Sequence, residues 1–313
     1  MESHLERVVM TDKVYKYAAI DIGSNAVRLL LAGISKTKEH KRPKKISWIR
    51  LPIRLGQDAF LQGEISTEQV KRFEHTLTGF KYLIKAFEPR DVMACATAAM
   101  RAAKNGKEIC ERIREKTDIP IRIIDGKEEA RILFKNRLVD MVPGGIAALC
   151  IDVGGGSTEM TIFFDDRIVA SRSFNIGTIR LLNQTVDPSV WEDMKVWLEQ
   201  NTKSFRAVEA VGSGGNINKM FRLVGGKSNR PVAYDKVLRM RDSLNEMSLE
   251  QRIDIYNLRP DRADVIVPGS DIYLRAMAWA DCQKIHVPML GLADGMVRVM
   301  HDRYRNGELP DLS

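Results

Sequence analysis

Two stretches decide the fold of this chain: AAIDIGSNAVRLLL at residues 18–31 and LCIDVGGGSTEMTI at residues 149–162. Each reads as an apolar strand with an aspartate near its end, a turn containing glycine, and a second strand that returns beside the first. An architecture that occurs twice predicts two similar domains related by a pseudo-twofold axis. We therefore expect an α/β protein whose two halves face each other across a cleft.

The length of the chain supports this division. At 313 residues it is long for a single hydrophobic core. Strands alternate with helices along it, and we place the domain boundary in a helix expected from about Glu128 to Asp140. The predicted domains are residues 12–131 and 132–313, with the last helix able to pack back on the first domain.

Local signals mark individual helices. Ser66 and Gln69 have the spacing of a capping box, and an apolar face follows them until Pro89 ends the helix. A helix over 262–281 is expected to be interrupted at Pro268-Gly269, because proline breaks helices. These features predict helices packed on sheets.

The charge of the chain favours an anionic partner. Its net charge is +8, and summed positive potential steers polyanions toward a site. The basic run from Lys36 to Lys45 contributes much of this charge, but such a run is typical of a solvated hairpin loop. No aromatic residue interleaves it, so no nucleic-acid partner is expected.

Other classes of protein are excluded by composition. The apolar runs are shorter than the ~20 residues that cross a bilayer, and the N-terminal MESHLERVVM is unlike a signal peptide. We therefore expect a cytoplasmic protein without a membrane partner. The four cysteines and five histidines lack disulfide or zinc spacing, which predicts reduced thiols.

The glycine loops are candidate phosphate sites. Loops of this kind bring backbone N–H groups close to an anion, because no Cβ atom stands in the way. One such loop could be only a tight hairpin. Three follow strands in this chain, at 23–25, 154–157 and 212–215, and their number favours phosphate binding.

Carboxylates flank the second loop. Asp152 and Glu159 would meet at the mouth of a tight hairpin, and Mg²⁺ prefers such oxygen ligands. Asp21 takes the place of Asp152 in the first hairpin and would either hold a metal-bound water or orient its own loop. Arg101, after a short strand, could bind phosphate oxygens.

Two adjacent glutamates open the helix near the domain junction. Glu128 and Glu129 must face different ways on a helix, so one of them is expected to address the cleft. That glutamate could orient the proton of an attacking water. The residues themselves leave the choice between the two open.

Seven ordered motifs resemble those of the exopolyphosphatase and guanosine pentaphosphate phosphohydrolase family (Ppx/GppA), which belongs to the clan of actin, sugar kinases and acetate kinase. They are DIGSNAVRL, ATAAMR, IIDGKEEARIL, IDVGGGSTE, VGSGGNINKM, RADVIVPG and GLADGM, and the resemblance extends from about Tyr17 to about Val299. The resemblance implies two actin-like, ribonuclease H-like domains in the short two-domain form, and a homodimer.

The resemblance also implies roles for residues. Glu129 matches the catalytic glutamate of the family, and Asp152 and Glu159 match its magnesium ligands. The positions on its phosphate-contacting segments are Gly23, Ser24, Asn25, Arg101, Gly154, Gly155, Gly156, Ser157, Gly214 and Gly215. Ala26 departs from the serine usual in the family, which puts in doubt a side-chain contact there.

The function that the resemblance implies is an exopolyphosphatase, which releases terminal phosphate from inorganic polyphosphate with Mg²⁺ by in-line attack of water. A first alternative is the same chemistry on guanosine pentaphosphate. A second, from another class, is a non-catalytic sensor of polyanions or nucleotides, which the acidic residues at 129, 152 and 159 disfavour. A kinase is weaker still, since no sugar-binding motif is recognisable.

Overall fold

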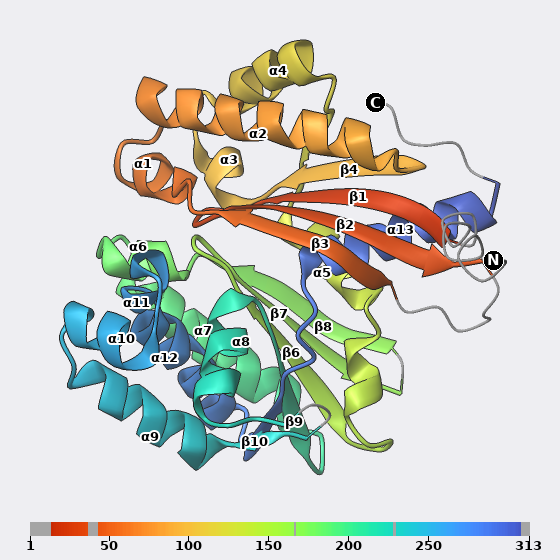
Figure 1. Cartoon of the computed structure of the whole chain (residues 1–313). Coiled ribbons are helices and arrows are strands. Elements are labelled where there is room, and N and C mark those ends of the chain that lie inside the picture. Colours follow the sequence, from red (N-terminus) through yellow and green to blue (C-terminus); the bar gives the residue numbers. More distant parts are fainter. Residues whose placement is uncertain (1–13, 37–42, 166, 228–229, 308–313) are drawn as a thin grey trace, which may run out of the picture.

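The computed structural model describes residues 14–36, 43–165, 167–227 and 230–307. Most of the predicted basic hairpin loop therefore lies outside the described residues. Figure 1 shows two lobes, each with a sheet and helices packed against it. No helix of the described residues is long and apolar enough to cross a membrane.

The first lobe contains a five-stranded sheet in the order β3-β2-β1-β4-β5. Strands β1 and β2 form the antiparallel hairpin predicted around the first loop, and β4 runs parallel to β1. The elements of this lobe are β1 (Val14–Ile22), β2 (Val27–Ser35), β3 (Lys44–Leu51), α1 (Leu55–Leu61), α2 (Thr67–Phe87), β4 (Asp91–Ala96), α3 (Ala98–Ala102), α4 (Gly106–Thr117) and β5 (Ile121–Ile123).

The second lobe repeats this order. Its sheet, β8-β7-β6-β9-β11 with β10 added at the end, has the same sequence of strands as the first sheet plus one edge strand. The elements that follow β5 are α5 (Gly126–Phe134), the 3₁₀ turn η2 (Leu138–Met141), β6 (Ala147–Val153), β7 (Thr158–Phe164), β8 (Arg167–Phe174), α6 (Thr178–Leu182), α7 (Pro188–Thr202), β9 (Val208–Ser213), α8 (Gly215–Leu223), β10 (Val232–Ala233), α9 (Tyr234–Asn245), α10 (Leu249–Tyr256), α11 (Pro260–Ala263), α12 (Ile266–Trp279), β11 (Lys284–His286) and α13 (Leu292–Arg305). The duplication and the fold class predicted from the sequence, two actin-like α/β domains, are confirmed.

Two helix predictions need correction. The helix expected over Glu128–Asp140 ends at Phe134, and only a 3₁₀ turn follows it. The expected interruption at Pro268-Gly269 is absent, because α12 begins at Ile266 and places the proline in its first turn, where a missing N–H costs nothing. The break instead precedes α12, at Asp264 and Val265.

Only one of the two hydrogen bonds of the predicted capping box on α2 is present among the described residues. The Ser66 hydroxyl accepts the Gln69 N–H at 3.4 Å, whereas the Ser66 N–H donates to Asp58 Oδ2. Asp58 on α1 thus replaces the glutamine side chain. The start of α2 is fixed to the neighbouring helix by this contact.

The last helix, α13, packs on the first sheet. Its Met296 and Val297 lie in one apolar cluster with Tyr17 of β1 and Leu30 of β2. The Tyr17 hydroxyl also contacts His301 Nδ1 at 3.0 Å. The chain therefore returns to the first lobe at its end, while the division at residues 131 and 132 stays a prediction.

Candidate active site

A cleft of about 600 Å³ opens between the tips of the two predicted hairpins. Both glycine loops line it, together with the N-terminus of α8 and the start of α13. The predicted site residues that line this cleft are Asp21, Gly23, Ser24, Asn25, Glu129, Asp152, Gly154, Gly155, Gly156, Ser157, Gly214 and Gly215. Residues up to 194 positions apart in the chain, Asp21 and Gly215, thus share one space, as the duplication predicts.

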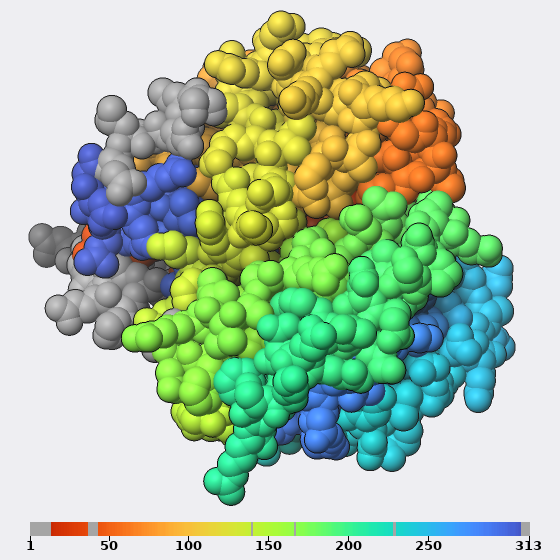
Figure 2. All heavy atoms as spheres, turned by 180° about the vertical axis from the view of Figure 1, so that it is seen from behind, coloured from red at the N-terminus to blue at the C-terminus, as the bar shows by residue number. Residues whose placement is uncertain are grey.

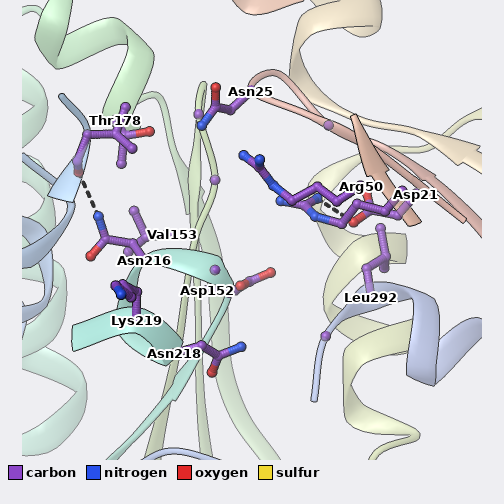
Figure 3. Close-up of a pocket in the computed structure, with 18 of the residues that line it drawn as sticks. Asp21, Asn25, Arg50, Asp152, Val153, Thr178, Asn216, Asn218, Lys219 and Leu292 are labelled. Carbon is purple, nitrogen blue, oxygen red and sulfur yellow. Dashed lines mark hydrogen bonds and ion pairs between the residues drawn. The ribbon is translucent and has the colours of Figure 1, made fainter. Parts of the chain in front are cut away.

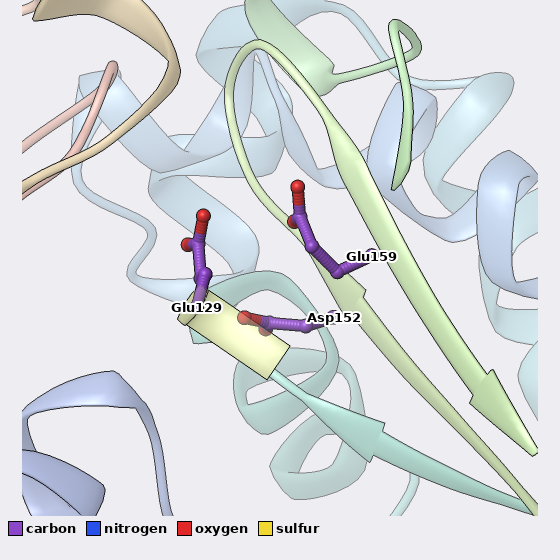
Figure 4. A group of neighbouring side chains, drawn as sticks. All are labelled: Glu129, Asp152 and Glu159. Atoms are coloured by element: carbon purple, nitrogen blue, oxygen red, sulfur yellow. The ribbon is translucent and has the colours of Figure 1, made fainter. Parts of the chain in front are cut away.

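Three carboxylates meet beside the cleft: Glu129 and Asp152 line it, whereas Glu159 lines a small separate cavity together with Asp152. One oxygen each of Glu129, Asp152 and Glu159 lies within 4.8 Å of the others, and Figure 4 shows their side chains arriving from α5, β6 and β7. Asp152 and Glu159 are directly opposite each other in the β6–β7 ladder. The antiparallel register therefore brings the carboxylates together, as expected for side chains that face each other across a hairpin.

The environment raises the pKa of all three acids. Burial is the largest cause for Glu129, whose pKa lies well above its usual value, and the charges of Glu159 and Asp152 add to it. Burial, followed by the charge of Glu159, raises the pKa of Asp152 from 3.8 to about 7. Burial also raises the pKa of Glu159, although hydrogen bonds from Ser157 and Ser173 lower it in part.

This cluster fits a divalent cation. Glu159 Oε1 accepts hydrogen bonds from Ser157 Oγ at 2.7 Å and Ser173 Oγ at 2.9 Å, whereas Glu129 Oε2 is buried and has no hydrogen-bond partner among the residues that the structure describes. Buried like charges are costly unless a cation compensates them. Hard oxygen ligands of this kind suit Mg²⁺ or a similar ion.

Glu128 and Glu129 separate as helix geometry requires. The Asp125 side chain caps α5 by accepting the Glu128 N–H at 2.8 Å. Glu128 turns outward and pairs with Arg122 at 2.6 Å, while Glu129 is 8% exposed and points into the cluster. The cap fixes the start of α5. The side chains of Ile132 and Leu133, three and four positions after Glu129, are buried against α13, so the same face of the helix turns Glu129 inward.

Two other predicted residues, Asp21 and Arg101, bond to neighbouring groups of the protein. Asp21 forms an ion pair with Arg28 at 2.6 Å within its own hairpin. This contact is what the second alternative, an aspartate that orients its own loop, would require. Arg101 does not line the cleft, and its Nη1 donates to the Ile124 carbonyl at 2.6 Å. Its charge still lowers the pKa of Glu129. Its contact with phosphate stays a prediction.

The glycines of the second loop also permit the two lobes to touch. A Cβ atom on Gly155 would lie 2.8 Å from Ser24 Cβ of the first loop, and one on Gly156 would lie 2.2 Å from the Phe60 ring. Close approach of backbone to a neighbour is one reason for glycine. These two positions therefore serve lobe-to-lobe packing, whether or not they bind phosphate.

Glycines 214 and 215 have distinct roles at the start of α8. Gly214 has φ +105°, which disfavours any side chain, and a Cβ there would lie 3.0 Å from Asp152 Oδ1. The space beside Gly215 is filled by the Arg262 guanidinium, 2.3 Å from where a Cβ would stand. The third loop therefore brings an arginine to the cleft as well as its own N–H groups.

Gly156→Ala is expected to destabilise the protein by about 1–3 kcal/mol, because the added methyl group overpacks against Phe60 and Ala98. Chemical denaturation measures this difference. Gly144→Ala is the control, since no atom of the described part of the chain lies within 4 Å of a Cβ at that position. Equal stability of the two variants would contradict the packing role of Gly156.

Sequence reasoning missed the cations of the cleft. Arg28, Arg50, Lys219, Arg222, Arg259 and Arg262 line it. Burial, followed by the charges of Arg50 and Arg28, lowers the pKa of Arg262 to about 9. Figure 3 shows Arg50 from the first lobe and Lys219 from α8 around the same pocket. Arg28, Lys219 and Arg262 stand in the quoted motifs DIGSNAVRL, VGSGGNINKM and RADVIVPG. Their presence in these motifs was the signal by which the sequence could have indicated them.

The fold and the site define a phosphatase built on two actin-like domains. The family model described as "Ppx/GppA phosphatase family" matches residues 34–303, which is most of the chain. The chain therefore belongs to the Ppx/GppA phosphatase family, and the resemblance stated above is confirmed.

Curated relatives are distant. The putative exopolyphosphatase of Haemophilus influenzae is 25% identical over 96% of this chain and 94% of its own length. Exopolyphosphatase 2 of Mycobacterium tuberculosis is 25% identical over 82% of this chain and 88% of its own length. A bifunctional 3-dehydroquinate synthase/phosphatase of Fusobacterium nucleatum is 26% identical over 87% of this chain, which spans only 46% of that protein.

Solved structures share the fold. An exopolyphosphatase from Cytophaga hutchinsonii has a TM-score of 0.79 at 23% identity, covering 92% of this chain and 98% of the other. The Aquifex aeolicus PPX-GPPA enzyme has a TM-score of 0.72 at 25% identity, covering 91% and 99%.

Proposed function

We propose that this chain is an exopolyphosphatase that hydrolyses the terminal phosphoanhydride of inorganic polyphosphate with Mg²⁺. The observation that carries the proposal is the cluster of Glu129, Asp152 and Glu159, of which the first two line a cleft together with two glycine loops and several cations. Two relatives that match along most of their length are a putative exopolyphosphatase and exopolyphosphatase 2.

Asp152 and Glu159 would hold Mg²⁺ by their carboxylate oxygens. The bound ion would neutralise charge on the terminal phosphate. The hydroxyls of Ser157 and Ser173 fix the orientation of Glu159, and ligands held in this way bind metals more tightly. The chain itself thus supplies a preorganised anionic floor for the site.

Glu129 would accept a proton from the attacking water. Its Oε2 is free of hydrogen bonds within the described residues, so it can receive one from water. The backbone N–H groups of the glycine loops would hold the terminal phosphoryl group, and Arg28 with Lys219 would face the rest of the phosphate chain across the cleft. Positioning and charge stabilisation supply most of the catalysis in phosphoryl transfer.

The test is phosphate release from polyphosphate of defined length, with Mg²⁺ and with excess chelator. Release that requires the metal supports the proposal. Metal-dependent binding of polyphosphate without any release would instead favour the non-catalytic sensor. The cytoplasmic location and the homodimer stay predictions.

The pKa of Asp152, about 7 in the folded protein and 3.8 as its ordinary value, predicts opposite effects of pH on two properties. Between these pH values the folded state binds more protons than the unfolded chain, so the metal-free protein loses stability as pH rises toward 7. Mg²⁺ must displace the proton of Asp152 to bind there. The affinity of the protein for Mg²⁺ should therefore rise about tenfold per pH unit below pH 7 and become independent of pH above it. Mg²⁺ titrations from pH 5.5 to 8, followed by thermal unfolding, measure both. A pH-independent affinity would contradict this prediction.

A further inference from the structure

A buried tyrosine hydroxyl joins the ends of the two central strands of the second sheet. The side chain of Tyr273, on α12, is completely buried. Its Oη accepts a hydrogen bond from the Val153 N–H at 3.3 Å and donates one to the Ser213 carbonyl. Val153 is the last residue of β6, and Ser213 is the last residue of β9. A single hydroxyl therefore connects the two points at which the second and third glycine loops begin.

These two contacts hold the backbone next to the Asp152 carboxylate. The Val153 N–H belongs to the peptide group that directly follows Asp152, and Asp152 is paired with Ser213 at the end of the β6–β9 ladder. A Cβ atom on Gly214 would lie 3.0 Å from Asp152 Oδ1 and 3.5 Å from Tyr273 Oη. The carboxylate, the start of the third loop and the hydroxyl thus form one closely packed group.

The Tyr273 hydroxyl suits this position because it can accept one hydrogen bond and donate another at the same time. Burial, followed by the charge of Asp152, holds the pKa of Tyr273 well above its usual value, so the hydroxyl keeps the proton that it donates to Ser213. Buried backbone groups need hydrogen-bond partners, and a phenylalanine at this position would offer none. Removal of the hydroxyl would therefore take away the link between the two strand ends.

The helix that carries Tyr273 is itself fixed to the third loop. Gly269 stands one turn before Tyr273 on the same face of α12, and a Cβ there would lie 2.1 Å from Asn216 Nδ2 of α8. The same Nδ2 donates to the Val265 carbonyl at 2.6 Å, just before α12 begins. The Tyr273 ring lies in the apolar core of the second lobe. The hydroxyl is thus presented by a side chain and a helix that are both held in place.

We infer that Tyr273 is a positioning residue of the metal site, whose hydroxyl sets the spacing between the Asp152 carboxylate and the third glycine loop that Mg²⁺ requires. Mg²⁺ demands a nearly ideal arrangement of ligands, whereas the larger Ca²⁺ tolerates an irregular one. A tyrosine that only fills the core would affect the binding of both ions alike. The inference rests on the metal site of the proposed function, and the preference for the smaller ion is what distinguishes the two roles.

Tyr273→Phe removes only the hydroxyl and keeps the ring in the core. Because groups that orient a metal ligand contribute to affinity, it is expected to weaken Mg²⁺ binding about 10- to 100-fold. Ca²⁺ binding should weaken less than about threefold, since its coordination is more flexible. Calorimetric titration of the substrate-free protein at pH 8 measures both affinities. Gly214→Ala, which would crowd the Asp152 carboxylate from the loop, is a second variant and should reduce the preference for Mg²⁺ in the same way.

Tyr17→Phe is the matched control for Tyr273→Phe. Tyr17 is also completely buried, and its hydroxyl contacts His301 Nδ1 at 3.0 Å. It packs against α13, whose end Figure 2 shows in dark blue on the first lobe. The loss of one buried hydroxyl should lower the unfolding temperature of both variants by a similar amount. Tyr17→Phe should nevertheless leave the affinities for Mg²⁺ and Ca²⁺ within about twofold of those of the unaltered protein.

Two results with Tyr273→Phe would overturn the inference: equal losses of affinity for Mg²⁺ and Ca²⁺, or a Mg²⁺ affinity like that of the unaltered protein. An unaltered protein that binds no Mg²⁺ would overturn it as well. Failure of the proposed function is distinct, because the unaltered protein would then bind Mg²⁺ and release no phosphate from polyphosphate. The ion affinities would still decide the role of Tyr273 in that case.

Discussion

Glu129→Gln is expected to lower the rate of phosphate release from polyphosphate by about 10²- to 10⁴-fold, the contribution typical of a general base. The amide keeps the size of the side chain but cannot take a proton from water. Because Glu129 also lies within the carboxylate cluster, Mg²⁺ affinity should be measured beside kcat. A general base loses turnover and keeps the metal, whereas a metal ligand loses both.

Glu128→Gln is the matched control for this variant. It makes the same chemical change one position earlier, on a side chain that is turned outward and paired with Arg122. Partly exposed ion pairs contribute about 1 kcal/mol or less to stability, so its activity should stay within about twofold of the unaltered protein. Wild-type phosphate release by Glu129→Gln, or equal losses in both variants, would contradict the role of Glu129.

Asp152→Asn is expected to abolish the stabilisation by Mg²⁺ and to lower phosphate release at least about 100-fold, because a carboxylate ligand is lost. Without metal, the same variant should unfold at a higher temperature than the unaltered protein near pH 8. The reason is that Asp152 and Glu159 repel each other when ionised, and the amide removes one charge. Thermal unfolding with and without Mg²⁺ measures the two opposite shifts.

Asp193→Asn serves as the control for Asp152→Asn. The Asp193 side chain is 62% exposed and pairs only loosely with Arg172, at 3.4 Å. Its removal should change neither the metal-induced shift nor the activity. If Asp152→Asn kept a Mg²⁺-dependent shift of unaltered size, the ion would bind elsewhere, and the proposed ligands would be wrong.

Much of the fold could be predicted from the sequence because its signals are local. The alternating apolar residues and the glycine turns of 18–31 and 149–162 predict two hairpins, and the same strand order in both sheets follows from their duplication. The errors lay where tertiary contacts outweigh local preference. Pro268, expected to break a helix, sits instead in the first turn of α12, where Asn216 Nδ2 donates to the Val265 carbonyl just before it.

The residues of the candidate site also fall into those that the local sequence predicts and those that it does not. Asp152 and Glu159 could be paired from the sequence, because a hairpin of known turn length fixes which side chains face each other. Arg262 and Lys219 stand in the motifs RADVIVPG and VGSGGNINKM, but their place in the cleft depends on segments that meet only in the folded chain. Glu129 was chosen over Glu128 by resemblance, and the structure adds the physical cause, the burial of Ile132 and Leu133 on the same face of α5 as Glu129.

The sequence by itself determined the two hairpins, their glycine turns and the carboxylates beside the second one, since these depend on residues within a few positions of one another. Only the tertiary structure decided that the β3 side chains Lys45, Trp48 and Arg50 line the cleft. That outcome required an unpaired residue in β3 and two ion pairs, Lys45 with Asp294 and Arg50 with Asp261. The two residues of each ion pair are more than 200 positions apart in the chain and meet only when both lobes have folded. No local sequence pattern can therefore predict these contacts.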